Sequence, residues 1–484
     1  MKINITDVLK KILAISAYTI FGMILGIIIL YIYLMQNRPD LHPWHTLNLE
    51  EEFTIKSTSK IKTFPEYLAQ EEKLFDELQE KVYNNWKDKR EHQLIRYDPT
   101  SIANSFLYKT NWNRSFELKQ EKPAGGVLLL HGLSDSPYSL RELANTLHQQ
   151  GNYVLGLRMP GHGTVPSGLV DTSWQDMAAA VKIAVRHLSD KISSRPLYII
   201  GYSMGAAQAV NYSLDALQDK SLTKAESLVL ISPAIGVSSV AAFAIWQSRL
   251  SVIPGLDKLA WNSIGPEYDP YKYTSFAVNA GDLMYRLTLA IDDKMALLQK
   301  QDRAAEFPRV QAFISAVDAT VSVSAVVDHL LDELSNNGNE LVVFDINRNK
   351  HIIPFVNNDP EEGLISVFRR EDINFKLSLL TNESADSFTV VEIHKDRDHT
   401  VTKRELDLVW PDNIYSLSLV ALPFSETNSL YGSKPENDTG LHIGRMSPRG
   451  ERIVLSVPAS DSLRLRYNPF YRYLQQRVVN FLAE

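Results

Sequence analysis

The chain has 484 residues, 44% of them apolar and 22% charged, which is the composition of a globular protein and excludes a wholly disordered, collagen-like or multi-span membrane chain. A formal net charge of -7 disfavours nucleic-acid binding, because phosphate backbones attract basic surfaces. The sequence contains no cysteine, so disulfides, thiolate metal sites and a cysteine nucleophile are excluded.

A long apolar segment lies near the N-terminus. Leu13 to Leu34 contains no charged residue, and a helix of these 22 residues is about 33 Å long, enough to cross a bilayer. Lysines precede the segment, and acidic residues dominate the stretch that follows it. The positive-inside rule therefore predicts a single-pass anchor over residues 1–37 with a cytoplasmic N-terminus. The rest of the chain is then outside the cytosol, on the periplasmic side of the inner membrane in a Gram-negative cell.

A cleaved signal peptide is the alternative, but the apolar run exceeds a typical h-region and no small-x-small cleavage site follows it directly.

Residues 38–122 are predicted to form an N-terminal extension. Its main feature is an amphipathic helix from Thr63 to Lys89, with Pro65 in the first turn and apolar residues at helical spacing. We expect this helix to pack against the rest of the protein.

Strands and helices alternate from residue 126 onward. The predicted strands are Gly126–Leu130, Tyr153–Leu157, Leu197–Gly201, Ser227–Ile231, Val310–Ala316 and Leu341–Asp345. The predicted helices are Ser139–Gln149, Thr172–Leu188, Met204–Leu217, Ser322–Leu334 and Tyr471–Leu482. This order predicts an α/β domain over residues 123–484, in which a mostly parallel sheet has helices on both faces. Two stretches interrupt the order, an inserted cap at about 236–306 and a β-rich antiparallel insertion at about 346–413.

A nucleophile elbow is predicted at Gly201-Tyr202-Ser203-Met204-Gly205, where a strand gives way to a helix. The sharp turn presents the serine at the carboxyl edge of the sheet, and the glycines leave room for the neighbouring backbone. The helix N-terminus favours negative charge that develops there. Ser203 is therefore the candidate nucleophile, and an ordinary glycine-rich turn is the alternative.

The loop after the first long strand is expected to form part of an oxyanion hole. It begins with His131 and Gly132, and in this architecture it contributes one backbone amide while the residue after the nucleophile contributes the other. The amides of Leu133 and Met204 are the predicted donors. His131 precedes the nucleophile, contrary to the expected order of serine, acid and histidine, so we interpret it as a hydrogen-bonded structural residue. His162, in a Pro-Gly-His-Gly loop, has the same interpretation.

The acid of a catalytic triad should end the strand that follows the cap, and Asp318 has that position. Capping of the next helix is the alternative role for it, and Asp345 is a weaker rival for the acid. The base should follow the strand that ends at Asp345, and His351 is the predicted base. The other candidates are His394, His399 and His442.

Together these motifs resemble the α/β-hydrolase superfamily, specifically its monoglyceride-lipase and serine-aminopeptidase-like branch. The shared features are the strand leading to His131 and Gly132, the loop at 160–163, the elbow at Ser203, and Asp318 followed by Val321. The resemblance covers roughly residues 123–345 and the closing helix. It implies ester or amide hydrolysis, which needs no metal or organic cofactor.

The ends of the chain also resemble a group of membrane-anchored bacterial hydrolases of this type. Those proteins have a Pro-Trp-His stretch after the anchor, like residues 43–45 here, and a late Tyr-Ser-Leu-Ser-His before Ala-Leu-Pro-Phe. This sequence has Leu419 where the histidine of that pattern stands. The resemblance implies that Leu419 replaces the triad histidine, so turnover requires another histidine.

Two functions of different classes follow. The first is a membrane-anchored serine hydrolase that cleaves a carboxylic ester, such as a lipid-derived acyl ester. Ser203 attacks the carbonyl, a histidine carries the proton and Asp318 orients that histidine. The second is a catalytically impaired protein of the same fold that binds a ligand or partner at the membrane. Leu419 favours the second function, and the intact elbow and Asp318 favour the first.

Overall fold

The computed structural model describes residues 5–86, 94–236, 250–251, 253–318, 320–335, 338–357, 359–436, 440–445 and 464–484. Its α-helices are α1 (Ile5–Gln36), α2 (Pro43–Thr46), α3 (Phe64–Leu78), α4 (Arg141–Gln149), α5 (Gly168–Asp171), α6 (Trp174–Ile192), α7 (Met204–Gln218), α10 (Val278–Lys300), α11 (Val323–Val326), α12 (Glu361–Arg369) and α14 (Tyr471–Ala483). Its strands are β1 (Phe116–Leu118), β2 (Gly126–Leu130), β3 (Tyr153–Leu157), β4 (Leu197–Tyr202), β5 (Ser227–Ile231), β6 (Trp261–Ser263), β7 (Phe276–Ala277), β8 (Arg309–Ser315), β9 (Glu340–Phe344), β10 (Lys376–Asn382), β11 (Thr389–Lys395) and β12 (Val401–Val409). Every strand predicted in the alternating region is present, with its ends within one residue of the prediction.

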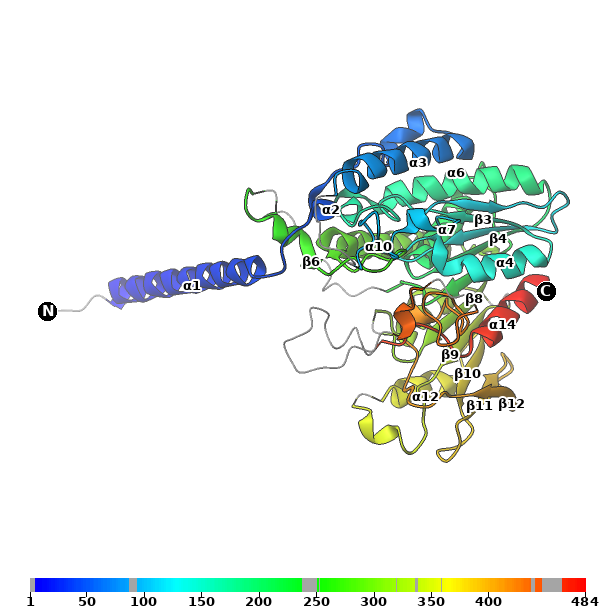
Figure 1. The fold of residues 1–484 in the computed structure, drawn as a ribbon. Coiled ribbons are helices and arrows are strands. Elements are labelled where there is room, and N and C mark those ends of the chain that lie inside the picture. Colours follow the sequence, from blue (N-terminus) through cyan, green and yellow to red (C-terminus); the bar gives the residue numbers. More distant parts are fainter. Residues whose placement is uncertain are drawn as a thin grey trace.

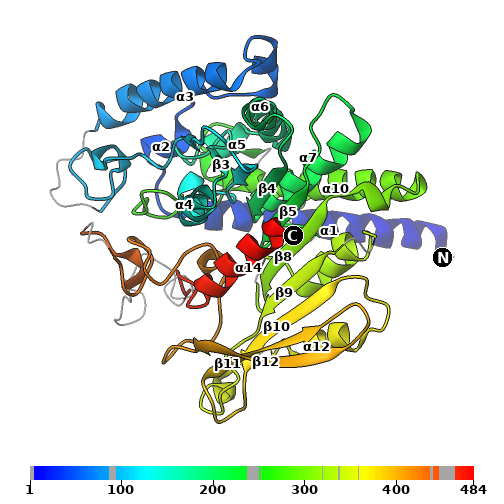
Figure 2. The same cartoon turned by 90° about the vertical axis from the view of Figure 1, so that its right-hand side faces the viewer.

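One ten-stranded sheet organises the domain, in the order β1-β3-β2-β4-β5-β8-β9-β10-β11-β12. The strands from β3 to β10 in this order are parallel, and β1, β11 and β12 pair antiparallel with their neighbours. Helices α6, α7 and α10 cover one face of the sheet, and α4 and α14 cover the other (Figures 1 and 2). Because the parallel strands share one direction, the loops after β2, β4, β8 and β9 emerge at the same edge of the sheet.

The parallel strands are buried on both faces, as their continuous apolar sequences predict. In β2, Leu128 and Leu130 belong to the core beneath α6 and α7. Val127 and Leu129 belong to the core beneath α4 and α14. Successive side chains of a strand point to opposite faces, so one short strand stabilises both layers.

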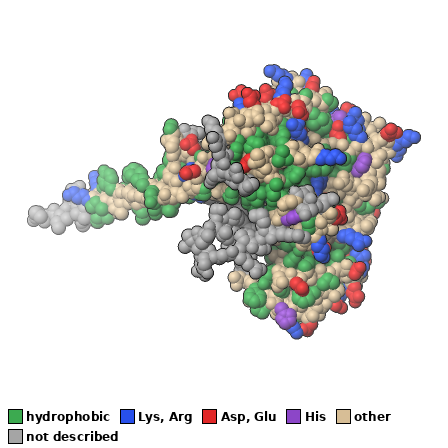
Figure 3. Space-filling model, in the orientation of Figure 1, with side chains coloured by type: hydrophobic (Ala, Val, Ile, Leu, Met, Phe, Trp, Pro, Cys, Tyr) green, Lys and Arg blue, Asp and Glu red, His purple; other side chains and the backbone are tan. Residues whose placement is uncertain are grey.

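Helix α1 projects away from the domain (Figure 1). Its segment Leu9–Gln36 is the one helix among the described residues that is long and apolar enough to cross a membrane, and its most apolar window is 0% buried. Apolar side chains cover much of this helix, and the basic side chains at its N-terminal end are lysines (Figure 3). At the other end, Arg38 donates to the Trp261 carbonyl at 2.7 Å and Lys258 pairs with Asp40 at 2.9 Å. These contacts join the end of the apolar helix to the α/β domain.

The N-terminal extension contains the predicted amphipathic helix, although the helix is shorter than predicted. Thr63 caps α3, because its side chain accepts a hydrogen bond from the Glu66 amide at 3.4 Å. Residues 87–89 of the predicted helix lie outside the described residues. The apolar side of α3 is buried, partly in the main core and partly in a small separate core where Leu74 meets Trp44.

The two interruptions of the strand–helix order have different structures. The three strands in residues 346–413, β10, β11 and β12, pair antiparallel with one another, as expected for this insertion. Strand β10 also pairs parallel with β9, so the insertion extends the main sheet. Helix α12 supplies the crossover that a parallel connection requires. Residues 236–306 include α10, which packs against α7 and contributes Leu287 to the main core. Residues 237–249 and 252 of the predicted cap lie outside the described residues, and the cap as a unit stays a prediction.

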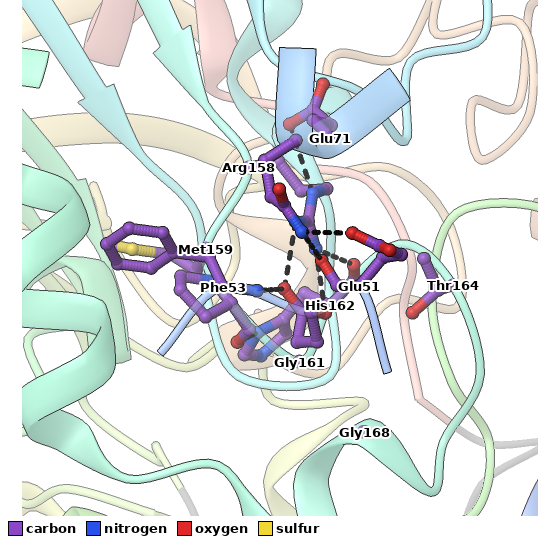
Figure 4. A network of polar contacts seen from close by, with 12 residues as sticks. Glu51, Phe53, Glu71, Arg158, Met159, Gly161, His162, Thr164 and Gly168 are labelled. Carbon is purple, nitrogen blue, oxygen red and sulfur yellow. Dashed lines mark hydrogen bonds and ion pairs between the residues drawn. The ribbon is translucent and has the colours of Figure 1, made fainter. Parts of the chain in front are cut away.

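A buried arginine joins the N-terminal extension to the loop after β3 (Figure 4). The Arg158 side chain is 1% exposed and pairs with Glu52 at 3.0 Å and with Glu71 at 3.1 Å. Its guanidinium also donates to the His162 carbonyl at 3.0 Å. Burial by itself lowers the pKa of Arg158, but Glu52, Tyr67 and Glu71 together raise it well above its ordinary value, so the guanidinium stays charged. Two acids of the extension therefore hold one cation of the α/β domain.

Helix α7 begins very close to the end of β2. A Cβ atom at Gly205 would collide with the Leu130 carbonyl oxygen, and a Cβ at Gly201 would collide with the backbone of Ala206. Only glycine lets the first turn of α7 approach the two strands at this distance. The elbow glycines therefore serve packing as well as the turn itself.

We predict that Gly205→Ala lowers the free energy of unfolding by about 3 kcal/mol or more, because the added methyl group meets backbone that cannot move alone. Urea titration of the full chain, followed by tryptophan fluorescence, measures the change. The matched control is Gly363→Ala on α12, where an added Cβ has nothing within 4 Å. This control should stabilise the protein by up to about 1 kcal/mol. Equal effects of the two changes would contradict the close approach.

We also predict that Arg158→Met lowers the free energy of unfolding by about 3–5 kcal/mol, because it leaves the Glu52 and Glu71 carboxylates buried without their cation. Lys224→Met is the control, since Lys224 and Glu306 form an exposed pair at 3.1 Å. The control should change stability by less than about 0.5 kcal/mol. A loss below about 1 kcal/mol in Arg158→Met would mean that water compensates the two acids.

Candidate active site

Ser203 lies in the turn between β4 and α7 with φ 54° and ψ -113°, a conformation that costs a non-glycine residue about 1–3 kcal/mol. The end of β5 holds it there. The Ser203 amide donates to the Ile231 carbonyl at 2.8 Å, and its carbonyl accepts from the Ala234 amide at 3.2 Å. Met204 follows as the first residue of α7, where backbone amides have no partner within the helix. This is the strained turn that the elbow sequence predicts.

The loop after β2 lies directly beside the nucleophile candidate. A Cβ at Gly132 would be 3.3 Å from the Ser203 Cβ and would press on the Tyr202 ring. No described contact uses the amide of the next residue, Leu133, and Ser134 turns the loop with φ 61°. The predicted oxyanion donors, the amides of Leu133 and Met204, therefore belong to the residues that directly follow two close neighbours, Gly132 and Ser203. Their role in binding an oxyanion stays a prediction.

His131 is buried and holds two loops together. Its Nδ1 donates to the Gly132 carbonyl at 2.9 Å, and its Nε2 accepts from the Met159 amide at 3.0 Å. Burial, followed by the neighbouring His162, lowers the pKa of His131 well below its ordinary value, so the ring is neutral. His162 is buried against it, with ring centroids 5.0 Å apart and a pKa that burial lowers to about 3. Both histidines are hydrogen-bonded in the interior, as the sequence interpretation expects.

Asp318 follows β8 at the same edge of the sheet. Its Oδ1 accepts from the amides of Thr320 at 2.8 Å and Val321 at 3.1 Å, and Ser322 rather than Asp318 caps the next helix. Burial raises the pKa of Asp318, while these two amides and the adjoining Ser232 hydroxyl act in the opposite direction. The second oxygen, Oδ2, is buried and accepts no hydrogen bond of normal geometry from any residue that the structure describes. A triad histidine would donate to an oxygen of this kind.

The structure does not bring His351 to Ser203 or Asp318. His351 lies in an exposed turn after β9, where its backbone amide donates to Asn349 Oδ1 at 3.0 Å. No described contact joins its imidazole to the candidate nucleophile or acid. His351 as the base stays a prediction, and it requires the loop after β9 to move.

The rival residues have other partners or positions. The Asp345 carboxylate forms an ion pair with Arg348 at 2.5 Å, so we assign Asp345 a structural role. His394 shares a hydrogen bond with a serine of β10, and His399 lies in the exposed turn between β11 and β12. The ring of His442 contacts a backbone carbonyl at 3.2 Å.

Leu419 lies next to the elbow, although it is far from Ser203 in the sequence. The Tyr202 hydroxyl donates to the Leu419 carbonyl at 3.3 Å. The Ser315 hydroxyl, at the end of β8, donates to the Leu417 carbonyl at 2.7 Å. The segment with Leu419 therefore contacts both the strand before the nucleophile and the strand before Asp318. The membrane-anchored hydrolases that this sequence resembles have a histidine at this position of the pattern.

Two polar residues at this edge were missed by the sequence interpretation. Ser232 directly follows β5 with φ 43°, and its buried hydroxyl adjoins Asp318. Lys272 donates to the Ser134 hydroxyl at 3.2 Å, and burial lowers the pKa of Lys272. Ser232 could have been found in the sequence as the polar residue that directly follows the predicted strand Ser227–Ile231. No sequence signal pointed to Lys272. Among the described residues, no cluster of three or more His, Cys, Asp or Glu is arranged to hold a metal ion.

Comparison with known proteins gives one family. Residues 121–345 match the family described as serine aminopeptidase, S33. A thermostable monoacylglycerol lipase from Bacillus sp. (strain H-257) is 34% identical over 80 residues, which are 16% of this chain and 31% of that lipase. The match therefore spans about a third of the length of this curated relative.

Solved structures of lipases also align with the domain. The monoacylglycerol lipase of Paleococcus ferrophilus covers 48% of this chain and 88% of its own, with 20% identity and a TM-score of 0.36. A soluble variant of the monoglyceride lipase of Saccharomyces cerevisiae covers 47% of this chain and 81% of its own, with 14% identity and a TM-score of 0.36. The sheet order and the family match together show that this chain has the α/β-hydrolase fold, and residues 121–345 are similar to the monoglyceride-lipase and serine aminopeptidase S33 branch of that superfamily.

Proposed function

We propose that this chain is a membrane-anchored serine hydrolase that cleaves a carboxylic ester through an acyl-enzyme. The observation that carries the proposal is the conformation of Ser203, a non-glycine residue held at φ 54° beside Gly132. Strain of this kind persists only where the surrounding structure enforces it, and it is concentrated at active sites. The sequence match to a monoacylglycerol lipase supports an ester as the bond that is cleaved.

The reaction follows from the groups at the carboxyl edge of the sheet. The Ser203 hydroxyl attacks the ester carbonyl, and the amides of Leu133 and Met204 stabilise the oxyanion. A histidine takes the serine proton and returns it to the leaving alcohol, and water then hydrolyses the acyl-enzyme. Asp318 orients that histidine through its buried Oδ2. His351 is the proposed base, and the steps use no metal or organic cofactor.

A lipid-derived acyl ester suits a domain that is tethered beside a bilayer. We propose that residues 1–37 form the anchor and that the span at residues 13–34 crosses the membrane with the N-terminus in the cytoplasm. Residues 38–122 are the extension, and residues 123–484 form a hydrolase domain outside the cytosol. Charge supports this orientation, because Lys10 and Lys11 lie at the N-terminal end of the span.

We predict that a fluorophosphonate probe labels the full chain in detergent and that Ser203→Ala abolishes the labelling, because the probe reacts with an activated serine. Hydrolysis of short-chain p-nitrophenyl esters should fall by about 10⁴-fold or to background in the same variant. Ser213→Ala, on the same helix, should keep both signals. Within the described part of the chain, its buried hydroxyl bonds to the Ala209 carbonyl, one turn earlier. A folded chain that neither labels nor hydrolyses esters would reject this function.

A second function is favoured by a specific observation. The Leu419 carbonyl accepts a hydrogen bond from Tyr202, and no described residue donates a hydrogen bond of normal geometry to Asp318 Oδ2. An aliphatic residue therefore stands where an imidazole is expected. On this reading the chain is a catalytically impaired protein of the α/β-hydrolase fold that binds a ligand or partner at the membrane. The oxyanion hole and substrate binding by themselves retain only weak catalysis.

We predict for this second function that Leu419→His raises ester hydrolysis by about 10²-fold or more, because the new imidazole reaches Asp318 Oδ2 and the serine hydroxyl. Leu419→Gln is the control, since it is polar but is not a base near neutral pH. The double variant Leu419→His with Asp318→Asn should lose most of the gain. If the unchanged chain already hydrolyses esters and Leu419→His adds nothing, the base lies elsewhere and the first function stands.

A further inference from the structure

A pocket lies on the α/β domain, well away from the elbow at Ser203. It has a volume of about 450 Å³, within the range of ligand sites, and forms between the turn Ile55–Ser59, the outer side of α6 and the ends of α7 and α10. Asp215 lines this pocket and lies twelve residues after Ser203 on α7, which is about 18 Å along the helix. The pocket is therefore separate from the proposed ester-cleaving site.

The walls of this pocket are apolar and come from both parts of the protein. Ile61 of the extension and Ile183 of α6 are 9% and 7% exposed, and the Trp174 ring contributes an aromatic side. The extension is fixed against α6, because the Ile55 amide donates to the Asp176 carboxylate at 2.6 Å. Asp176 is also the reciprocal capping partner of Ser173 at the start of α6. The wall is therefore a built feature of the fold.

Positive charge surrounds this apolar interior, in a chain whose net charge is -7. The lining residues include the cations Lys62, Lys182, Arg186 and Lys294 but a single acid, Asp215. Lys182 and Lys294 share that acid, at 2.8 Å and 2.6 Å.

The other two cations, Lys62 and Arg186, form no ion pair within the described part of the chain. Lys294 is further held by Asn211 at 2.6 Å and lies 5.7 Å from the centre of the Trp174 ring. The basic lining therefore favours a ligand with an anionic group. The apolar interior favours a ligand in which a hydrocarbon chain is attached to that group.

We propose that this pocket binds a single-chain anionic amphiphile, such as an acyl carboxylate, with the chain against Ile61, Ile183 and Trp174. Lys62 and Arg186 bind the anionic head, because neither side chain is held in an ion pair with a described acid, whereas Lys182 and Lys294 are held by Asp215. The site does not depend on turnover at Ser203, so it is tested in the Ser203→Ala protein.

The probe is decanoate labelled with ¹³C at the carboxyl group, titrated against the full Ser203→Ala chain in phosphatidylcholine nanodiscs and followed by ¹³C NMR. Empty nanodiscs give the background from partition into the bilayer. We expect saturable binding that weakens by about threefold to tenfold in Lys62→Gln/Arg186→Gln, because both cations are exposed and each exposed ion pair contributes only modestly. The matched control Lys191→Gln/Arg195→Gln removes two exposed cations at the far end of α6 and should bind decanoate as before.

Three results would overturn the proposal. The first is equal binding by the two double variants, which would remove Lys62 and Arg186 from the site. The second is binding of butyrate or inorganic phosphate as tight as that of decanoate, which would indicate a plain anion site without a role for the apolar walls. The third is displacement of decanoate when phosphatidylglycerol is included in the nanodisc, which would assign the pocket to bilayer lipid.

Discussion

The first turn of α7 lies almost in contact with the end of β2, and the candidate site depends on this approach. Glycine at 205 and 201 is what allows the backbones to meet, because any Cβ there collides with backbone atoms. The helix must start at once after β4, and the residue between them takes a strained positive φ. Ser203 therefore points to the edge where the loops of the parallel strands emerge, beside Gly132.

The N-terminal extension supports the same edge from outside the sheet. Glu52 and Glu71 hold the buried Arg158, and the residue after it, Met159, donates its amide to His131. His131 in turn binds the carbonyl of Gly132. Hydrogen bonds and ion pairs thus run from the extension to the loop beside the nucleophile candidate. The extension is part of the support of the site as well as a link to the apolar helix.

The backbone around the candidate site holds Ser203 and Asp318 in place, but no described contact joins a histidine to either residue. The elbow strain, the close loop and the buried Asp318 Oδ2, which no described residue hydrogen-bonds with normal geometry, all fit the proton transfer proposed for Ser203. The segment that contacts both the elbow strand and the acid strand has Leu419 at the expected histidine position. The two proposed functions therefore share one fold. They differ in whether a histidine imidazole reaches Asp318 Oδ2, as the serine hydrolase requires and the binding protein does not. The pocket along α6 is independent of that difference.

The sequence by itself determined the strand and helix order and the strained turn at the elbow, because apolar periodicity and glycine spacing are local signals. The structural role of His131 followed from its place before Ser203 in the chain order. Thr63 as a helix cap belongs to the same class, since its partner is three residues away. Only the tertiary structure decided the parallel pairing of β10, the bridge from Arg158 to the extension, and the position of Leu419 beside Tyr202. These depend on contacts between residues far apart in the chain, and each forms only when the sheet and its loops close around them. For the same reason the sequence pointed to His351, the nearest histidine along the chain, whereas the folded loop leaves it exposed.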